Sequence, residues 1–93
     1  MTNLLNKSDA ASELLPVVVG MIHSVSAKAK QQDVKPRSLL LEELALDSLD
    51  LVRVIMLMED RYHITIDLDE VPKLKYVSDL TIMLARELRS AAA

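Results

Sequence analysis

The scarcity of glycine and proline is the feature that most limits what this chain can fold into. One glycine and three prolines stand among 93 residues, whereas a β-sandwich or barrel needs many such residues at its tight turns. Hydrophobic residues make up 51% of the chain, yet Phe and Trp are absent and Tyr occurs twice. The core must therefore be built from Leu, Ile, Val and Met. An aliphatic core with few turns favours a small all-α bundle in a single domain.

Charge and cysteine content exclude several kinds of function. The net charge is −3, and residues 39–93 hold eleven acidic against six basic residues. Because this acidic part would repel phosphates, we expect no nucleic-acid partner and a basic protein partner instead. The absence of cysteine rules out disulfides and Cys-ligated zinc, and it is compatible with the cytoplasmic location that we expect. His23 and His63 have no metal-binding spacing, so we expect no metal site.

An apolar run near the N-terminus has to be judged as a targeting segment. Residues 14–22 are almost wholly apolar, and the sequence A-K-A at 27–29 resembles a signal-peptidase site. Against secretion, acidic residues precede the run, and Pro16 and Gly20 interrupt it. The run is also far too short to span a bilayer. We therefore expect neither secretion nor stable membrane insertion.

The first predicted helix lies in this N-terminal part. Ser12 can act as its N-cap, and apolar residues follow at helical spacing until the helix fades near residues 29–30. Pro16 would lie close enough to this start that its missing N–H costs little. Residues 1–11 are polar and small, and we expect them to be a flexible lead-in. The folded domain is then expected to span residues 12–89.

Two further long helices are predicted in the second half of the chain. One begins at Asp47 or Ser48 and runs to about Arg61, because Asp47 can cap a helix whose first turn is acidic. The other covers about residues 78–89, with apolar residues along its inner face. Residues 90–93 are expected to be a disordered tail.

The segments between these helices are predicted to be irregular. Residues 31–47 form a long connection, because Pro36 prevents a helix from running through it. Residues 63–67 alternate like a strand but have no second strand to pair with, so an extended loop is expected. A short helical turn is expected at residues 69–74, where Pro72 limits its length. Four leucines of the long connection are too apolar for a solvated linker and are predicted to pack onto the bundle: Leu39, Leu40, Leu41 and Leu44.

The helix that starts near Asp47 has two apolar faces. A first stripe at helical spacing is assigned to the core and comprises Leu51, Val54, Ile55, Met58 and Tyr62. A second stripe lies on nearly the opposite side and comprises Leu49, Val52 and Met56, with Glu59 and Asp60 at its end. It could be scattered surface hydrophobes, which are ordinary, or an apolar docking patch with an acidic rim. The residues alone leave both interpretations open.

The segment around Ser48 resembles the phosphopantetheine-attachment motif of acyl carrier proteins. The motif is L-A-L-D-S-L-D-L-V at residues 44–52, and D-S-L alone would be a weak signal. Features at family-like spacing flank it over about residues 34–88. They are Val34, which precedes Asp47 with twelve residues between them, E-D-R-Y at 59–62, I-T-I at 64–66 and V-S-D-L at 77–80.

The resemblance implies a four-helix bundle with a long loop between helices one and two and a short third helix. It implies that a phosphopantetheinyl transferase attaches 4′-phosphopantetheine covalently to Ser48, between Asp47 and Leu49, and that the thiol of this arm carries acyl groups as thioesters. Asp47 and Asp50 would help the transferase recognise the site, with Asp47 near its metal ion. Because no histidine base accompanies Ser48, we expect a carrier and not an enzyme.

The resemblance also implies a docking surface for enzymes that synthesise or transfer acyl chains. Leu49, Val52 and Met56 match positions where the family docks its enzymes, and the acidic residues after them would meet basic residues of those partners. The docking set expected from the resemblance is Asp50, Val52, Arg53, Met56, Glu59 and Asp60.

Several positions depart from the family pattern. Ala45 stands where a glycine is usual, and Arg53 and Arg61 stand where fatty-acid-synthase members often have acids. Asp67 replaces a usual proline, and Tyr76 replaces a usual Thr cap. We infer a specialised carrier that serves its own dedicated enzymes.

Three hypotheses follow, and a monomer is expected for the first two. The first is an acyl carrier for fatty-acid or polyketide-type synthesis. The second is a peptidyl or aminoacyl carrier. Arg53 favours this hypothesis, whereas Asp50 favours the acyl carrier. The third is an unmodified helical module that dimerises through its apolar faces. For the carriers, a further hypothesis is that an acyl chain enters the core among the first helix and Val54, Met58, Ile66, Leu68 and Leu74.

Overall fold

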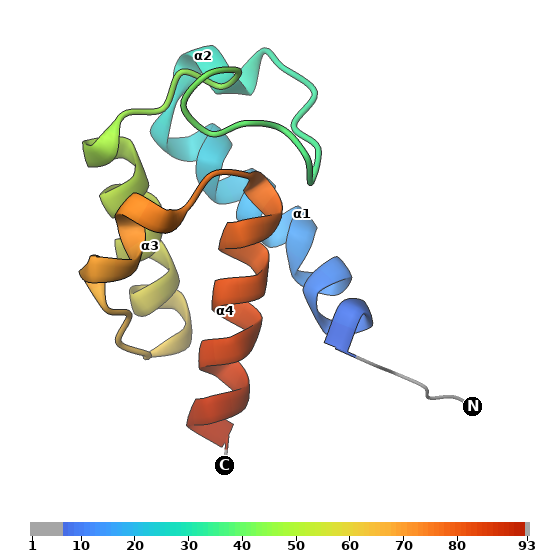
Figure 1. Cartoon of the computed structure of the whole chain (residues 1–93), viewed down its shortest axis with the longest axis vertical. Helices are drawn as coiled ribbons and strands as arrows, with labels where there is room; N and C mark the ends of the chain where they lie inside the picture. The colour runs from blue at the N-terminus through green and yellow to red at the C-terminus, as the bar shows by residue number, and fades with distance from the viewer. Residues whose placement is uncertain (1–6, 93) are drawn as a thin grey trace.

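The computed structural model describes residues 7–92 and shows a helical bundle (Figure 1). Its β pairing is limited, in this part of the chain, to one isolated antiparallel bridge between Leu39 and Tyr76. The prediction of an all-α fold with a long loop and a short third helix is confirmed. The elements are α1 (Lys7–Val25), α2 (Ala27–Lys30), α3 (Ser48–Tyr62), the 3₁₀ helix η1 (Leu68–Lys73) and α4 (Val77–Ala92).

The three long helices surround one aliphatic core. α1 packs chiefly against α4 and also against α3, and η1 packs against α3. Figure 1 shows α1 running behind α4, with α2 and the long loop closing one end of the bundle. At the other end, the start of α1 and the end of α4 diverge (Figure 1). The fully buried side chains come from all three helices and the loop: Val18, Ile22, Leu40, Leu44, Leu46, Val54, Ile55, Met58, Val77, Leu80 and Leu84.

The start of α1 differs from the prediction. α1 begins at Lys7, so Ser12 lies inside the helix and is not its N-cap. Residues 7–11 are helical and not part of a flexible lead-in, so the prediction was wrong for them. Residues 1–6 lie outside the described part. Alanines at 10 and 11 are strong helix formers that allow this extension. Pro16 therefore falls in the helix interior, where it removes a hydrogen bond, and packing of the buried face must offset that loss.

The two long helices at the ends of the chain also end elsewhere than predicted. α1 stops at Val25, because Ser26 is extended (φ −138°) and its side chain accepts a hydrogen bond from the Ala29 amide at 3.1 Å. Ser26 thus caps a separate short helix, α2, within the stretch predicted to continue α1. α4 continues to Ala92, so residues 90–92 are helical and not a disordered tail; Ala93 lies outside the described residues.

The long loop packs onto the bundle, as predicted, but not through every leucine. Leu40 and Leu44 are fully buried and Leu39 is half-buried, whereas Leu41 is 51% exposed, so the prediction for Leu41 was wrong. The amides of Glu43 and Leu44 both donate to the Leu39 carbonyl and close a tight turn. Such a turn places residues four apart on one side, which buries Leu40 and Leu44 together and turns Leu41 outward.

The segment between α3 and α4 matches its prediction except at its first residue. His63 is the left-handed C-cap of α3 (φ 55°), so it departs from the extended conformation expected; residues 64–67 form a loop without strand pairing, and Ile66 from this loop is buried. η1 follows where a short helical turn was expected, and Pro72 lies within it. The side chain of Asp67 caps η1 by accepting a hydrogen bond from the Asp69 amide at 2.9 Å.

Candidate functional site: the start of α3

Ser48 is the first residue of α3 and its side chain is exposed. The preceding Asp47 is extended (φ −98°, ψ −179°) and acts as the N-cap, as predicted. Its carboxylate accepts a hydrogen bond from the Asp50 amide at 2.8 Å, and the Asp50 carboxylate accepts one from the Asp47 amide at 3.2 Å. This reciprocal capping box is local, so four consecutive residues suffice to start the helix at Ser48.

The amides at this helix start are unequally used. The Leu51 amide donates to the Asp47 carbonyl at 3.1 Å, and the Asp50 amide donates to the Asp47 side chain. Within the described part of the chain, the amides of Ser48 and Leu49 donate to no protein group. Two free N–H groups at the positive end of a helix dipole, beside an exposed hydroxyl, form a site where a phosphate can be stabilised.

The segment that precedes Ser48 is anchored by two buried leucines, which flank a residue with a strained backbone. Leu44 and Leu46 are 1% and 2% exposed, and the Leu46 amide donates to the Leu40 carbonyl at 3.0 Å. Between them, Ala45 has a φ of 57°. This left-handed conformation is unfavourable for a residue with a Cβ, which explains why glycine is the usual residue at this position of the motif.

The two stripes predicted on α3 have different surroundings. In the core stripe, Leu51, Val54, Ile55 and Met58 are buried and Tyr62 is half-buried. In the second stripe, Leu49 is 57% exposed and Met56 is 58% exposed. We use "α3 patch" for the surface formed by the predicted docking residues together with Leu49: Leu49, Asp50, Val52, Arg53, Met56, Glu59 and Asp60.

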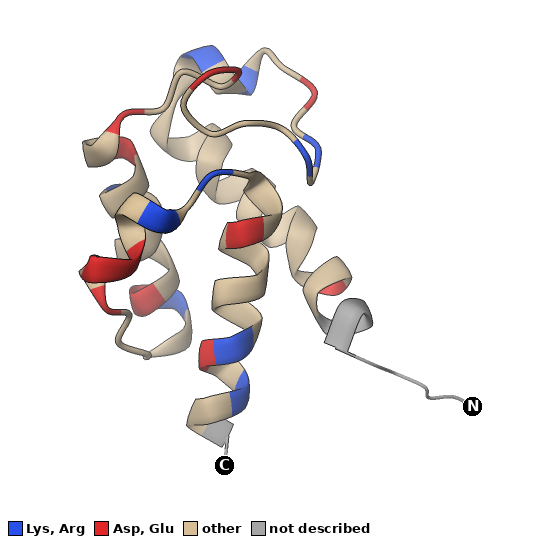
Figure 2. Cartoon of the chain, in the orientation of Figure 1, with Lys and Arg blue, Asp and Glu red and all other residues tan. Residues whose placement is uncertain are grey.

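Charged residues surround the apolar part of the α3 patch. Arg53 and Asp60 are exposed, whereas Val52 and Asp50 are half-buried. Glu59 is half-buried, and its carboxylate accepts a hydrogen bond from the Ile66 amide at 2.9 Å, so this acid also holds the loop after α3. Figure 2 shows acidic residues at both ends of α3 and on η1, and basic residues towards the end of α4.

The hypothesis for acyl-chain entry finds partial agreement in the burial pattern. Val54, Met58 and Ile66 are buried and Leu74 is half-buried, but Leu68 is 53% exposed. Leu68 therefore does not belong to the core.

Two hollows elsewhere were not anticipated from the sequence. One lies between α1 and α4, and the other lies between α1 and α3 beside Leu57, Asp60 and Arg61. The sequence contained one indication of each hollow. Leu57 and Ile82 are apolar residues outside the core stripes of their helices, and both are exposed.

Neither a metal cluster nor a membrane span is found in the part of the chain that the structure describes. No three side chains among His, Asp and Glu converge there; His23 lies in α1, and His63 directly follows α3. None of the helices at residues 7–92 combines the length and hydropathy needed to cross a bilayer.

Comparison with known proteins places this site in a family. The phosphopantetheine attachment site family matches residues 17–84, which covers most of the chain and the start of α3. The chain belongs to the acyl carrier protein family. A 48-residue stretch is 44% identical to an acyl carrier protein of Nitratidesulfovibrio vulgaris (strain Miyazaki F) and 42% identical to one of Helicobacter hepaticus. Each match covers 52% of this chain and 63% of the relative, so the chain spans somewhat less than two thirds of these curated relatives.

The fold is also that of a solved acyl carrier protein. A crystal structure of the acyl carrier protein from Thermotoga maritima superimposes with a TM-score of 0.75, over 88% of this chain and 94% of the other, at 23% sequence identity. Acyl carrier proteins are carriers and not catalysts, and family membership implies a covalently attached 4′-phosphopantetheine. The predictions of family, fold, cofactor and absence of catalytic activity are thereby confirmed.

Proposed function

We propose that this protein carries acyl intermediates as thioesters on a 4′-phosphopantetheine arm attached to Ser48. The observation that carries the proposal is the position of Ser48, exposed at the first turn of α3 beside the free amides of Ser48 and Leu49. A phosphodiester on the Ser48 hydroxyl would lie at the positive end of the helix dipole. When bound, the arm supplies a thiol that can hold an acyl group as a thioester.

The acids beside Ser48 have a structural use that leaves part of each carboxylate available. One oxygen of Asp47 and one of Asp50 take part in the capping box. The remaining oxygen of each can face a transferase, so capping and recognition are compatible. In this proposal Asp47 orients the helix start and lies near the metal ion of the transferase, and Asp50 supports both the capping box and recognition by the transferase.

The α3 patch is proposed as the docking surface for acyl-synthesising or acyl-transferring enzymes. Leu49 and Met56 expose more than half of their surface, and an apolar centre with a charged rim is typical of a protein interface. Arg53 adds a positive charge within this patch. We therefore expect partner enzymes that place an acidic group opposite Arg53 as well as basic groups opposite Asp60.

Intact mass spectrometry tests the attachment site. The chain is co-expressed with a phosphopantetheinyl transferase, and the wild type is expected to gain the mass of one phosphopantetheine group. Ser48→Ala is expected to gain nothing while keeping its helical circular dichroism. Ser24→Ala, on the exposed side of α1, is the matched control and should be modified like the wild type. An unmodified wild type with several transferases, or a modified Ser48→Ala variant, contradicts the proposal.

Acyl transfer assays test the docking surface on the modified protein. Met56→Ala is expected to slow loading by an acyltransferase, whereas Ile82→Ala, which removes an equally exposed apolar side chain of α4 (53% exposed), should leave the rate unchanged. Equal effects of the two substitutions would show that α3 has no special role in docking.

A peptidyl or aminoacyl carrier is the alternative within the carriers. Arg53 within the patch favours it, and the acids Asp50 and Asp60 favour the acyl carrier. Loading with acyl donors and with aminoacyl donors in parallel distinguishes the two. The proposal includes a monomeric state and a cytoplasmic location; an obligate dimer without a modified form in sedimentation experiments would favour an unmodified helical module.

A further inference from the structure

A groove of about 400 Å³ lies between the first half of α1 and α4. Ala11, Ser12 and Leu15 line it from α1, and none of its lining residues belongs to α3. It follows the divergence of the two helices that Figure 1 shows. Its volume falls within the range of roughly 300–1,000 Å³ that small-molecule sites occupy. The groove is thus large enough for a ligand and separate from the segment that contains Ser48.

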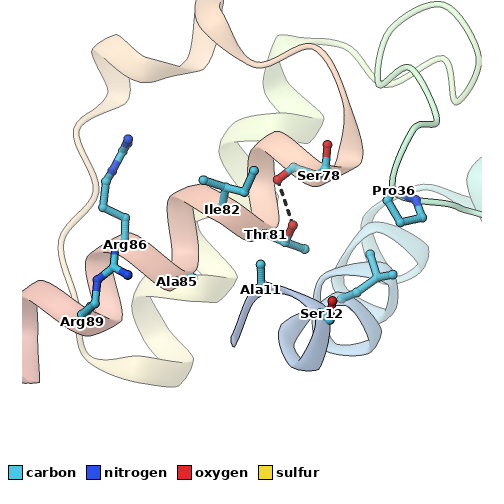
Figure 3. Close-up of a pocket in the computed structure, with 10 residues that line it drawn as sticks. Ala11, Ser12, Pro36, Ser78, Thr81, Ile82, Ala85, Arg86 and Arg89 are labelled. Carbon is cyan, nitrogen blue, oxygen red and sulfur yellow. Dashed lines mark hydrogen bonds between the residues drawn. The ribbon is translucent and has the colours of Figure 1, made fainter. Parts of the chain in front are cut away.

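The middle of the groove is apolar. Leu15 from α1 and the α4 residues Ile82 and Ala85 line it, and Ile82 is 53% exposed to solvent. The Thr81 hydroxyl already donates to the Ser78 carbonyl at 2.8 Å, so its proton is not available to a ligand (Figure 3). This part of the groove can therefore accommodate an alkyl chain but supplies little that would orient a polar molecule.

Two arginines lie at one end of the groove, away from Pro36 at the other (Figure 3). Arg86 and Arg89 are three positions apart on α4, a spacing that places two side chains on one helix face. Arg86 is 3.5 Å from the carboxylate of Glu70, which also lies 3.7 Å from Lys73 and is thus shared. No acidic group lies within 4.0 Å of Arg89 among the side chains that the structure describes, which are those of residues 11–91. The lining of the groove contains these two arginines and no acidic residue, so the groove itself presents positive charge at this end.

We propose that the groove between α1 and α4 is a non-covalent site for a long-chain carboxylate. The alkyl chain would lie along Leu15, Ile82 and Ala85, and the carboxylate would be bound by Arg89 with support from Arg86. A guanidinium group matches a carboxylate through two parallel hydrogen bonds, whereas it offers nothing comparable to a neutral head group. Because the site uses no residue of α3, it does not depend on the arm at Ser48.

Calorimetric titration of dodecanoate into the Ser48→Ala variant tests the site without interference from covalent loading. One saturable site is expected, with weaker binding of dodecanol, which has the same chain and no charge. Arg89→Gln is expected to weaken dodecanoate binding about tenfold, the effect of losing a hydrogen bond to a charged group. Arg53→Gln removes an exposed arginine from α3 and is the matched control. It should leave the affinity for dodecanoate unchanged. Equal affinity for dodecanol and dodecanoate would overturn the proposal.

Chemical-shift mapping locates the bound chain. Amide shifts on adding dodecanoate are expected along α4 near Ile82 and along α1 near Leu15. Ile82→Ser should abolish them, whereas Met56→Ser, at a comparably exposed position of α3, should not; thermal unfolding of both variants checks that they are folded. Shifts confined to the core around Val54 and Met58 would contradict the proposal. Binding to anionic phospholipid vesicles without binding of free dodecanoate would assign the groove to a membrane surface instead and would equally overturn it.

Discussion

α3 and α4 begin in chemically different ways, although an aspartate stands at the third position of each helix. At α3, Asp47 and Asp50 exchange hydrogen bonds and form a complete capping box. At α4, Asp79 accepts hydrogen bonds from the amides of Tyr76 and Lys75, both at 2.8 Å. Tyr76, the residue before α4, has no short polar side chain that could return a bond to the helix. α4 therefore has only half of a capping box.

The long loop supplies what the start of α4 lacks. The Val77 amide donates to the Ser38 carbonyl at 3.0 Å, and the Ser78 amide donates to the Pro36 carbonyl at 2.8 Å. The corresponding first amides of α3, at Ser48 and Leu49, remain without a protein acceptor within residues 7–92. The comparison shows that a locally capped helix can leave its first amides free for a ligand, whereas α4 uses the same groups to hold the fold.

The largest effect is expected from detaching the loop on which α4 depends. Leu40 is fully buried, and its amide donates to the Lys75 carbonyl at 2.9 Å. Leu40→Ala should lower the free energy of unfolding by about 2–5 kcal/mol, because it leaves a cavity in the core. Urea denaturation measures this loss. Leu41→Ala, at the exposed neighbour, should change stability by less than about 0.5 kcal/mol. Equal losses for the two variants would mean that the loop is not part of the core.

The next effect concerns the half capping box of α4. Asp79→Ala removes the acceptor for the amides of Lys75 and Tyr76 and should cost about 1–2 kcal/mol of unfolding free energy. It should leave the rate of phosphopantetheine addition unchanged, since Asp79 belongs to the start of α4. Denaturation and time-resolved mass spectrometry report the two quantities separately. A slower addition would show that the two helix starts are coupled.

At the start of α3, replacing the aspartate by alanine should affect both the free energy of unfolding and the rate of phosphopantetheine addition. Asp47→Ala removes the N-cap and should cost about 1 kcal/mol of unfolding free energy. It should also slow phosphopantetheine addition, because the helix start and a carboxylate beside Ser48 are lost together. Asp47→Asn keeps an acceptor for the cap, so its stability should be close to that of the wild type. If addition to Asp47→Asn is nevertheless slow, the charge of Asp47 acts on the transferase directly.

The smallest effect is expected from relieving strain in the approach to Ser48. Ala45→Gly should raise the free energy of unfolding by up to about 1 kcal/mol, because Ala45 has a positive φ of 57°. Gly20 provides the reverse test: it lies within α1, and an added Cβ would meet nothing within 4 Å. Gly20→Ala should therefore stabilise by about 0.5–1 kcal/mol. Denaturant midpoints measure both, and a destabilised Ala45→Gly variant would contradict the proposed strain.

The start of α3 could be predicted because its determinants are adjacent in the chain. Asp47, Ser48 and Asp50 contain the cap, the first residue and the box, and the structure places all of them as the spacing indicates. The start of α1 could not be predicted in the same way. Ser12 satisfies the local criteria for an N-cap, yet the helix continues past it to Lys7. A local signal is decisive only where no neighbouring residue offers the chain an equally stable continuation.

The α3 patch was predictable as a pattern, but its accessibility was not. Helical spacing placed Leu49 and Met56 on one face of α3, and only the packing of α1 and η1 against α3 elsewhere left them exposed. For Glu59, the tertiary structure adds a role that its place in the pattern did not indicate. It was predicted as part of the docking surface, and the fold additionally brings the Ile66 amide to its carboxylate, a contact across seven positions of the chain.

Sequence alone was sufficient for the all-α class, the capped start of α3 and the resemblance around Ser48, because composition, a four-residue capping signal and the spacing of motifs are properties of the chain that do not depend on how its helices pack. The tertiary structure decided which leucines of the long loop are buried, how the first amides of α4 are satisfied and that α1 and α4 diverge into a groove with Arg86 and Arg89 at its end. These features depend on contacts between distant segments, whose geometry emerges only when the helices pack together.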